Sequence, residues 1–171
     1  MAAVSNGSDR HPRATLAQEC GLSQPKPPLL AWPPDRHFAL AVLAAIPVWL
    51  ALALTLGERM RSPSGWAAWA SLVLVQPVLE ELLFRGVLQG QLLRLTGARR
   101  LGPLTVANLL ATIGFAAMHL IAQPPGWALA VAVPSLVFGH LRERFGSVAP
   151  AIAMHALYNA GFGFAAWLAR A

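Results

Sequence analysis

The feature that most constrains the fold of this 171-residue chain is a series of long apolar runs with almost no charge. The first run, residues 38–56, is about 19 residues long, just enough for a helix to cross a hydrocarbon core of about 30 Å. Only helices and closed barrels satisfy their own backbone hydrogen bonds in such a core. The runs are rich in Ala, Leu and Val without period-two alternation, which favours helices over a barrel.

Five such runs follow the first 37 residues. Charged residues, Pro or Gly separate them, and they cover residues 38–56, 66–93, 101–122, 127–141 and 148–168. The fourth run is the shortest and is expected to form a short or tilted helix. Because 56% of the residues are hydrophobic and only 12% are charged, the composition also indicates a membrane class. The predicted fold is an all-α, polytopic transmembrane bundle of about five membrane helices.

The first 37 residues differ from the rest of the chain. They are polar and Pro-rich and lack an apolar segment followed by a small-residue cleavage site, so a flexible polar tail is predicted rather than a signal peptide. Residues 38–171 are predicted to form one transmembrane domain. The single cysteine, Cys20, lies in the tail, which excludes an intrachain disulfide and CxxC-type chemistry.

The net charge of +6 comes from basic residues that flank the apolar runs instead of forming a patch with interleaved aromatics. A lipid bilayer is therefore the expected partner, and no nucleic acid is expected. Five spans would place nine basic residues on one side of the membrane and three on the other: Arg10, Arg13, Lys26, Arg36, Arg94, Arg99, Arg100, Arg142 and Arg144 against Arg59, Arg61 and Arg170. The positive-inside rule then places the amino terminus in the cytoplasm.

The second run carries an anomaly, because Glu80, Glu81 and Arg85 interrupt it and apolar residues continue beyond them. Carboxylates in the middle of a membrane helix are costly and point to a function. Adjacent residues diverge by about 100° on a helix, whereas Glu81 and Arg85 lie one turn apart and can pair. We therefore predict an internal Glu81–Arg85 ion pair and leave Glu80 as the freer base. The non-functional alternative is that this stretch lies at the membrane interface and is solvated.

Two further runs contain polar side chains. His119 follows Phe115 by one helical turn on the third run, and His155 and Asn159 share one face of the fifth. Each could be a packing residue or a hydrogen-bonding link between helices. The first and fourth runs contribute almost nothing polar, so convergence of the other three on one cavity is the economical interpretation.

This combination suits peptide hydrolysis, which needs a base for water, a partner to orient it and donors for the oxyanion. Glu80 is predicted to be the base and His119 to hold the water against it. His155 and Asn159 are predicted to supply the oxyanion donors, with Glu81 and Arg85 in support. No covalent nucleophile is required, and the membrane serines lack a His at helical spacing that would activate them.

The motifs EExxxR (Glu80, Glu81, Arg85), FxxxH (Phe115, His119) and HxxxN (His155, Asn159) resemble, in this order, those of the CAAX-protease and bacteriocin-processing family of intramembrane proteases. The resemblance covers about residues 66–164 as the catalytic core. It implies a glutamate-type protease without a metal, in which these residues hold the roles given above.

The resemblance also implies a biological setting. The chain is shorter than the larger family members and is similar to small bacterial ones, the MrtJ-like branch, which act beside proteins with a short carboxy-terminal sorting anchor. By this analogy we expect an integral protein of the bacterial inner membrane. Its expected substrate is a membrane-associated protein or peptide, processed at a carboxy-terminal anchor or sorting signal.

Two alternatives keep the same residues. Two imidazoles and a carboxylate are a common catalytic zinc set, so Glu80, His119 and His155 could bind zinc in a CAAX-type metalloprotease. The polar cluster could instead stabilise a non-catalytic membrane scaffold or immunity protein. A scaffold should tolerate Glu80→Gln, and an enzyme should not.

Overall fold

The computed structural model describes residues 14–31, 34–56, 60 and 62–170. Residues 1–13 of the predicted tail, and Arg59 and Arg61 of the charge count, lie outside this range. The described residues are mostly helical, with one short antiparallel hairpin of β1 (Arg100–Leu101) and β2 (Leu104–Thr105). The predicted all-α class is therefore confirmed in its helical character.

The first apolar run forms helix α2 (Arg36–Leu56). Asp35 caps its start, because the Oδ1 atom accepts hydrogen bonds from the backbone N–H groups of His37 and Phe38 at 3.0 and 3.2 Å. Further along the helix, Trp49 packs on Gly161, where a Cβ atom would lie only 2.0 Å from the indole. The missing side chain at Gly161 is therefore what lets α2 approach its neighbour.

The second run forms one continuous helix of 31 residues, Gly65–Leu95. Along it α3 (Gly65–Ala70), η2 (Ser71–Val75), α4 (Gln76–Glu81), η3 (Leu82–Leu88) and α5 (Gln89–Leu95) follow one another. The segments η2 and η3 are π-helical, a geometry found mostly as short bulges inside α-helices and frequently at functional sites. The predicted long helix with internal charges is confirmed, and π turns flank its acidic residues on both sides.

The remaining runs differ from prediction at their ends. The third begins in the hairpin, where Gly102 has a positive φ of 62°, so helix α6 spans only Val106–His119. The fourth divides into α7 (Pro125–Ala130) and α8 (Ala132–Phe145). Helix α8 continues past the predicted end, where Arg142, Glu143 and Arg144 are bound by other groups of the protein. Gly146, with φ 62°, caps the helix after Phe145. The fifth run forms α9 (Ala149–Leu168).

Two of these helices are long and apolar enough to cross a membrane by length and composition, Arg36–Leu56 and Gly65–Leu95. Helices α6 and α8 have 14 residues each. At 1.5 Å per residue that is about 21 Å, short of a hydrocarbon core of about 30 Å. The prediction of about five spans is therefore not confirmed.

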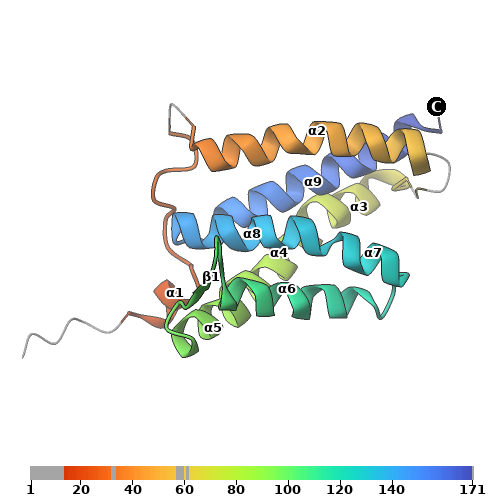
Figure 1. Cartoon of the computed structure of the whole chain (residues 1–171). Coiled ribbons are helices and arrows are strands. Elements are labelled where there is room, and N and C mark those ends of the chain that lie inside the picture. The colour runs from red at the N-terminus through yellow and green to blue at the C-terminus, as the bar shows by residue number, and fades with distance from the viewer. Residues whose placement is uncertain (1–13, 32–33, 57–59, 61, 171) are drawn as a thin grey trace, which may run out of the picture.

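The helices pack as a bundle in which α2 lies along α9, and α8 lies between α9 and α6 (Figure 1). Phe138, Leu141 and Met154 form part of the core between α8 and α9, each at most 2% exposed. The polar residues described below lie in this interior, at the meeting of Gly65–Leu95, α6, α8 and α9.

Part of the predicted tail packs on this bundle. The segment of residues 14–31 contains the short helix α1 (Leu16–Glu19), which lies beside α5 (Figure 1). Backbone hydrogen bonds join Lys26 N–H to the carbonyl of Phe145 at 2.9 Å and Val148 N–H to the carbonyl of Gly21 at 3.0 Å. This segment is thus attached to the helical domain, while the domain boundary at residue 37 stays a prediction.

Candidate active site

The centre of the polar cluster is the carboxylate of Glu81, which is fully buried at the end of α4. Its Oε2 atom lies 3.1 Å from Nε of Arg85, whose side chain is 1% exposed. Its Oε1 atom lies 2.9 Å from Nδ1 of His155 on α9. The predicted Glu81–Arg85 ion pair is confirmed. The sequence did not reveal that the same carboxylate also binds His155, which is 74 positions away.

The neighbouring Glu80 faces a different direction, as predicted for adjacent residues of a helix. Its side chain is 22% exposed, and its Oε2 atom lies 3.9 Å from Nε2 of His155. The His155 ring therefore lies between the two carboxylates, with one nitrogen directed to each. Of the two, Glu81 is held by an arginine, and Glu80 is the more accessible and less constrained group.

His119 is the last residue of α6, and its Nδ1 lies 2.9 Å from the carbonyl oxygen of Phe115. A carbonyl can only accept, so Nδ1 is the donor and Nε2 remains for another contact. The His119 ring packs on Phe115 at a centroid distance of 4.5 Å, and Phe115 also lies 6.1 Å from the His155 ring. Glu80 lies within electrostatic range of both imidazoles. Phe115 is thus the apolar group that both histidines share.

Asn159 follows His155 by one turn on α9, so the two side chains share a face as predicted. The Nδ2 atom of Asn159 donates to the carbonyl oxygen of Leu72, in the π-helical segment η2, at 2.9 Å. This bond ties α9 to the helix that carries Glu80. It uses one of the two amide hydrogens.

Helix α8 contributes more to the cluster than the sequence indicated. Phe138 stacks on His155 with a centroid distance of 4.7 Å and an interplanar angle of 17°. Ser135 accepts a hydrogen bond from Arg85 at 2.8 Å. The expectation that the fourth run brings almost nothing polar is therefore wrong. A lone serine in an apolar helix carries no signal that separates it from a packing residue.

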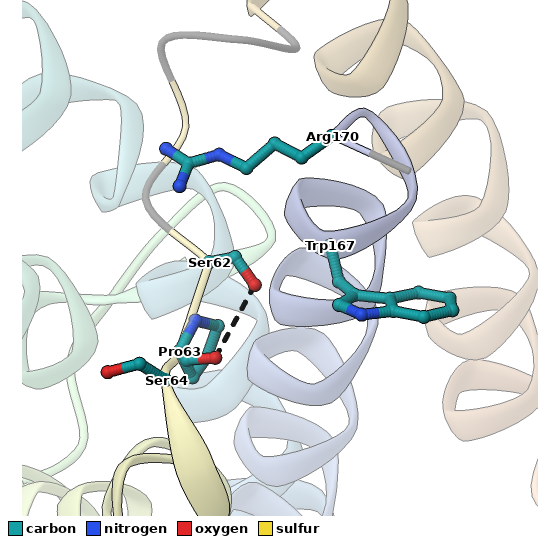
Figure 2. A pocket seen from close by; sticks show the side chains of 5 residues that line it. All are labelled: Ser62, Pro63, Ser64, Trp167 and Arg170. Atoms are coloured by element: carbon teal, nitrogen blue, oxygen red, sulfur yellow. Dashed lines mark hydrogen bonds between the residues drawn. The ribbon is translucent and has the colours of Figure 1, made fainter.

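Two cavities lie away from this cluster. One of about 520 Å³ lies beside the turn that follows His119, and it is lined by Leu56, Met60, Ala122, Gln123, Pro124, Trp127 and Phe162. The other, of about 300 Å³, is lined by Ser62, Pro63, Ser64, Trp167 and Arg170. Figure 2 shows Arg170 extending over the Ser62–Ser64 loop, where its guanidinium donates to the carbonyl oxygen of Met60 at 2.6 Å. Glu80 and His155 line neither cavity.

The zinc alternative requires Glu80, His119 and His155 around one ion. Within residues 14–31, 34–56, 60 and 62–170, no three His, Cys, Asp or Glu side chains are grouped closely enough to hold a metal. The Nδ1 atom of His155 binds Glu81, and its Nε2 atom faces the Glu80 carboxylate at 3.9 Å. Among the described residues, no third side chain of these types completes a ligand set with them.

Comparison with known proteins identifies the family. The chain matches the family model of the Rce1-like type II CAAX prenyl endopeptidases over residues 62–161. No curated protein and no solved structure matches it. The matched range contains all three motifs, and members of the family are membrane-embedded proteases. The chain therefore belongs to the Rce1-like family of CAAX-type intramembrane proteases, within the CAAX-protease and bacteriocin-processing group.

Proposed function

We propose that this protein is a glutamate-type intramembrane endopeptidase in which Glu80 activates the attacking water. The observation that carries the proposal is the placement of the His155 ring between the carboxylates of Glu80 and Glu81, with the second carboxylate held by Arg85. Polar groups separated by more than about 3.5 Å can be bridged by a water. The 3.9 Å gap between Glu80 and His155 leaves the Glu80 carboxylate free to bind the attacking water, beside the His155 nitrogen that would face the oxyanion.

In the proposed reaction Glu80 takes a proton from this water, and the hydroxide attacks the carbonyl carbon of the scissile peptide bond. His119 orients the water through Nε2, since its Nδ1 donates to the carbonyl of Phe115. The tetrahedral intermediate collapses, the C–N bond breaks, and the proton held by Glu80 passes to the leaving amine. The products are a carboxylic acid and a free amine, so all atoms and protons of the peptide and the water are accounted for without a cofactor.

His155 and Asn159 are proposed to stabilise the oxyanion. Nδ1 of His155 donates to Glu81, so Nε2 can donate to an oxyanion only when the ring is protonated. Two neighbouring carboxylates compensate that charge. Asn159 has one amide hydrogen left beyond the bond to Leu72. Glu81 and Arg85 then act by fixing the orientation of the His155 ring, as a carboxylate commonly does for a catalytic histidine.

The proposed substrate is a membrane-associated protein or peptide, cleaved at a carboxy-terminal anchor or sorting signal. The family name adds prenylated CaaX peptides as a second substrate class. The proposed setting is the bacterial inner membrane, with the amino terminus in the cytoplasm and residues 38–171 as the protease domain. The lipid bilayer is the partner that the exposed leucines of α2, such as Leu40 and Leu54, would contact.

The test compares wild-type protein with Glu80→Gln on three fluorogenic peptides. These are a farnesylated CaaX peptide, the same peptide without the lipid, and an apolar carboxy-terminal anchor peptide with basic flanks. Glu80→Gln preserves volume and hydrogen bonding but removes the base, so cleavage should be abolished in a folded protein. Full activity of a well-folded Glu80→Gln variant would contradict the proposal and would favour a scaffold.

A chelation series separates the mechanisms. Activity that survives exhaustive chelation supports direct activation of water by Glu80 and His119. Activity that is lost and then restored by added zinc would instead show a metalloprotease. His119→Ala should be nearly as severe as Glu80→Gln. Asn159→Ala should leave residual turnover, because the loss of one oxyanion donor typically lowers the rate by about 10² to 10³.

A further inference from the structure

The guanidinium of Arg85 has a second set of partners besides Glu81. Its Nη2 atom donates to Oγ of Ser135 at 2.8 Å and to the main-chain carbonyl of the same residue at 3.0 Å. Ser135 is 0% exposed. Hydrogen bonds to a buried charged group are stronger than those between neutral groups. Ser135 therefore fixes the position of Arg85 from helix α8, which none of the sequence motifs includes.

Ser135 is itself held by a directional chain of hydrogen bonds. Its Oγ atom donates to Oγ1 of Thr112 on α6 at 3.0 Å, and Thr112 donates to Oδ1 of Asn108 at 3.4 Å. The Asn108 amide donates in turn to the carbonyl of Leu136 at 3.0 Å. The hydroxyl groups of Ser135 and Thr112 each accept one hydrogen bond and donate one. Because Arg85 at the start of the chain can only donate, all the bonds run in the same direction. The hydrogen bonds within such a chain polarise and strengthen one another in a buried environment.

The aromatic rings around the guanidinium also link the position of Arg85 to that of His155. The Cζ atom of Arg85 lies 4.6 Å from the Phe115 ring centroid and 5.5 Å from that of Phe138. Both rings also contact His155. A shift of Arg85 would therefore disturb the Glu81 carboxylate and the rings that border the imidazole.

We propose that Ser135 and Thr112 are positioning residues of the active site, which hold Arg85 so that Glu81 presents a correctly oriented His155 to the substrate. This inference rests on the proposed protease function. Under this proposal the hydroxyl groups of α6 and α8 help to orient the site. These groups act in addition to the aromatic rings and the imidazole that the same two helices contribute.

The test uses substitutions that change hydroxyl groups with little change of shape. Thr112→Val removes the hydroxyl, and Thr112→Ser keeps it. Ser135→Ala removes the direct partner of Arg85, and Ser62→Ala, in the distant loop of Figure 2, is the matched serine control. We expect kcat to fall about ten- to a hundredfold for Ser135→Ala and about tenfold for Thr112→Val. The KM should stay near wild type, the midpoint of thermal unfolding should fall because a buried hydrogen bond is lost, and Thr112→Ser should restore both kcat and the midpoint.

A second readout does not depend on activity. In ¹⁵N-histidine-labelled protein the Nδ1 signal of His155 reports its hydrogen bond to Glu81. This signal should shift in Ser135→Ala and Thr112→Val and stay in place in Thr112→Ser and Ser62→Ala. A wild-type His155 signal together with wild-type kcat in a folded Ser135→Ala variant would overturn the inference, as would a loss of thermal stability without any change in kcat.

The spectra also separate this inference from the proposed function. If wild-type protein cleaves none of the peptides and the His155 signal still shifts in the two hydroxyl-free variants, the positioning contact stands and the protease proposal fails. If the wild type is active and the signal does not move, the protease proposal stands and the positioning role is overturned. Should Ser135→Ala fail to fold, the comparison of Thr112→Val with Thr112→Ser decides alone.

Discussion

Two ion pairs in this protein differ both in geometry and in surroundings. In the interior, Arg85 and Glu81 form a single contact of 3.1 Å with side chains 1% and 0% exposed. At the end of the bundle where α2 begins, Arg144 binds both carboxylate oxygens of Asp35 and approaches to 2.6 Å, and the side chains are 33% and 7% exposed. The closer pair is the one in contact with solvent. Distance is therefore a poor guide to the importance of an ion pair, and the surroundings of each charge decide it.

Water is the reason for the difference. A charge that loses its partner near solvent is rehydrated, and exposed pairs typically contribute about 0.2–1 kcal/mol. A charge stranded in the interior is not rehydrated, and removal of one partner destabilises by about 3–5 kcal/mol. The buried pair need not stabilise the fold relative to apolar residues, but it makes each partner indispensable to the other.

The largest expected effect is therefore at the interior pair. Glu81→Gln or Arg85→Ala should lower the free energy of unfolding by about 3–5 kcal/mol, together with folded yield and activity. Thermal unfolding in detergent and cleavage assays measure both effects. Glu80→Gln is the matched control, because Glu80 is 22% exposed and its substitution should remove activity and leave the fold. Equal unfolding midpoints for Glu81→Gln and Glu80→Gln would break the comparison.

The next effect concerns the contact between the interior around Arg85 and the amino-terminal segment of residues 14–31. Arg142 donates from Nε to the carbonyl of Arg85 at 3.1 Å, and its guanidinium also binds the carbonyl of Glu19. Gly90 lies at this contact, where a Cβ atom would be 2.4 Å from the Glu19 carbonyl oxygen. Gly90→Ala should destabilise by about 1–3 kcal/mol through overpacking and expose residues 14–31 to proteolysis.

Limited proteolysis with mass spectrometry follows the release of that segment. Gly126→Ala is the control, since nothing lies within 4 Å of a Cβ atom there and alanine is the better helix former. Equal protection of residues 14–31 in both variants would show that the amino-terminal segment does not need the space at Gly90.

A smaller effect is expected for Asp35→Asn, which keeps a capping side chain for α2 and removes the charge. The loss should be about 0.2–1 kcal/mol near neutral pH. The hydrogen bond from Arg144 lowers the pKa of Asp35 from 3.8 to about 2. The ionised carboxylate therefore contributes stability above pH 3.8, and this contribution is lost as the pH falls through 2. The unfolding curves of wild type and variant should converge there, and a difference that persists at pH 2 would exclude this cause.

The smallest effect is expected for Arg94→Gln. The Arg94 guanidinium lies 3.6 Å from the Glu19 carboxylate and is 62% exposed. Solvent and salt screen such a pair, so the unfolding midpoint should not change measurably between low and high ionic strength. A clear loss of stability at low salt would show that charge alone attaches the amino-terminal segment.

Local patterns in the sequence predicted local structure well. The run of residues 38–56 gave α2 almost to the residue, and the four-residue spacing of Glu81 and Arg85 gave their ion pair. Both depend on neighbours along one helix, which a sequence displays directly. The hairpin before α6 was missed although the Gly102–Pro103 dipeptide signals a turn.

Contacts between distant segments could not be read in this way. The hydrogen bonds of Glu81 to His155 and of Arg85 to Ser135 join residues that are 74 and 50 positions apart. They exist only because of how the helices cross. The packing of Glu19 and Cys20 on the second long helix had a visible signal, because Gly86 and Gly90 are four residues apart and such pairs allow close backbone approach. The partner segment was not visible.

The π-helical segment η3 decides where this helix can change its length. A π turn holds one more residue than the α turn it replaces, so the helix could absorb a one-residue deletion within Leu82–Leu88 by returning to α geometry. Side chains beyond the deletion would then keep their direction relative to Glu81, because the π turn and its extra residue are lost together. A one-residue deletion in an α-helical stretch before Gln89 would instead rotate every later side chain by about 100°, and Gln89 would leave Glu143, which it binds at 2.7 Å. Hydropathy would barely change in either case. In an alignment of relatives, the position of a one-residue gap would therefore separate chains that keep the site from chains that keep only the membrane helix.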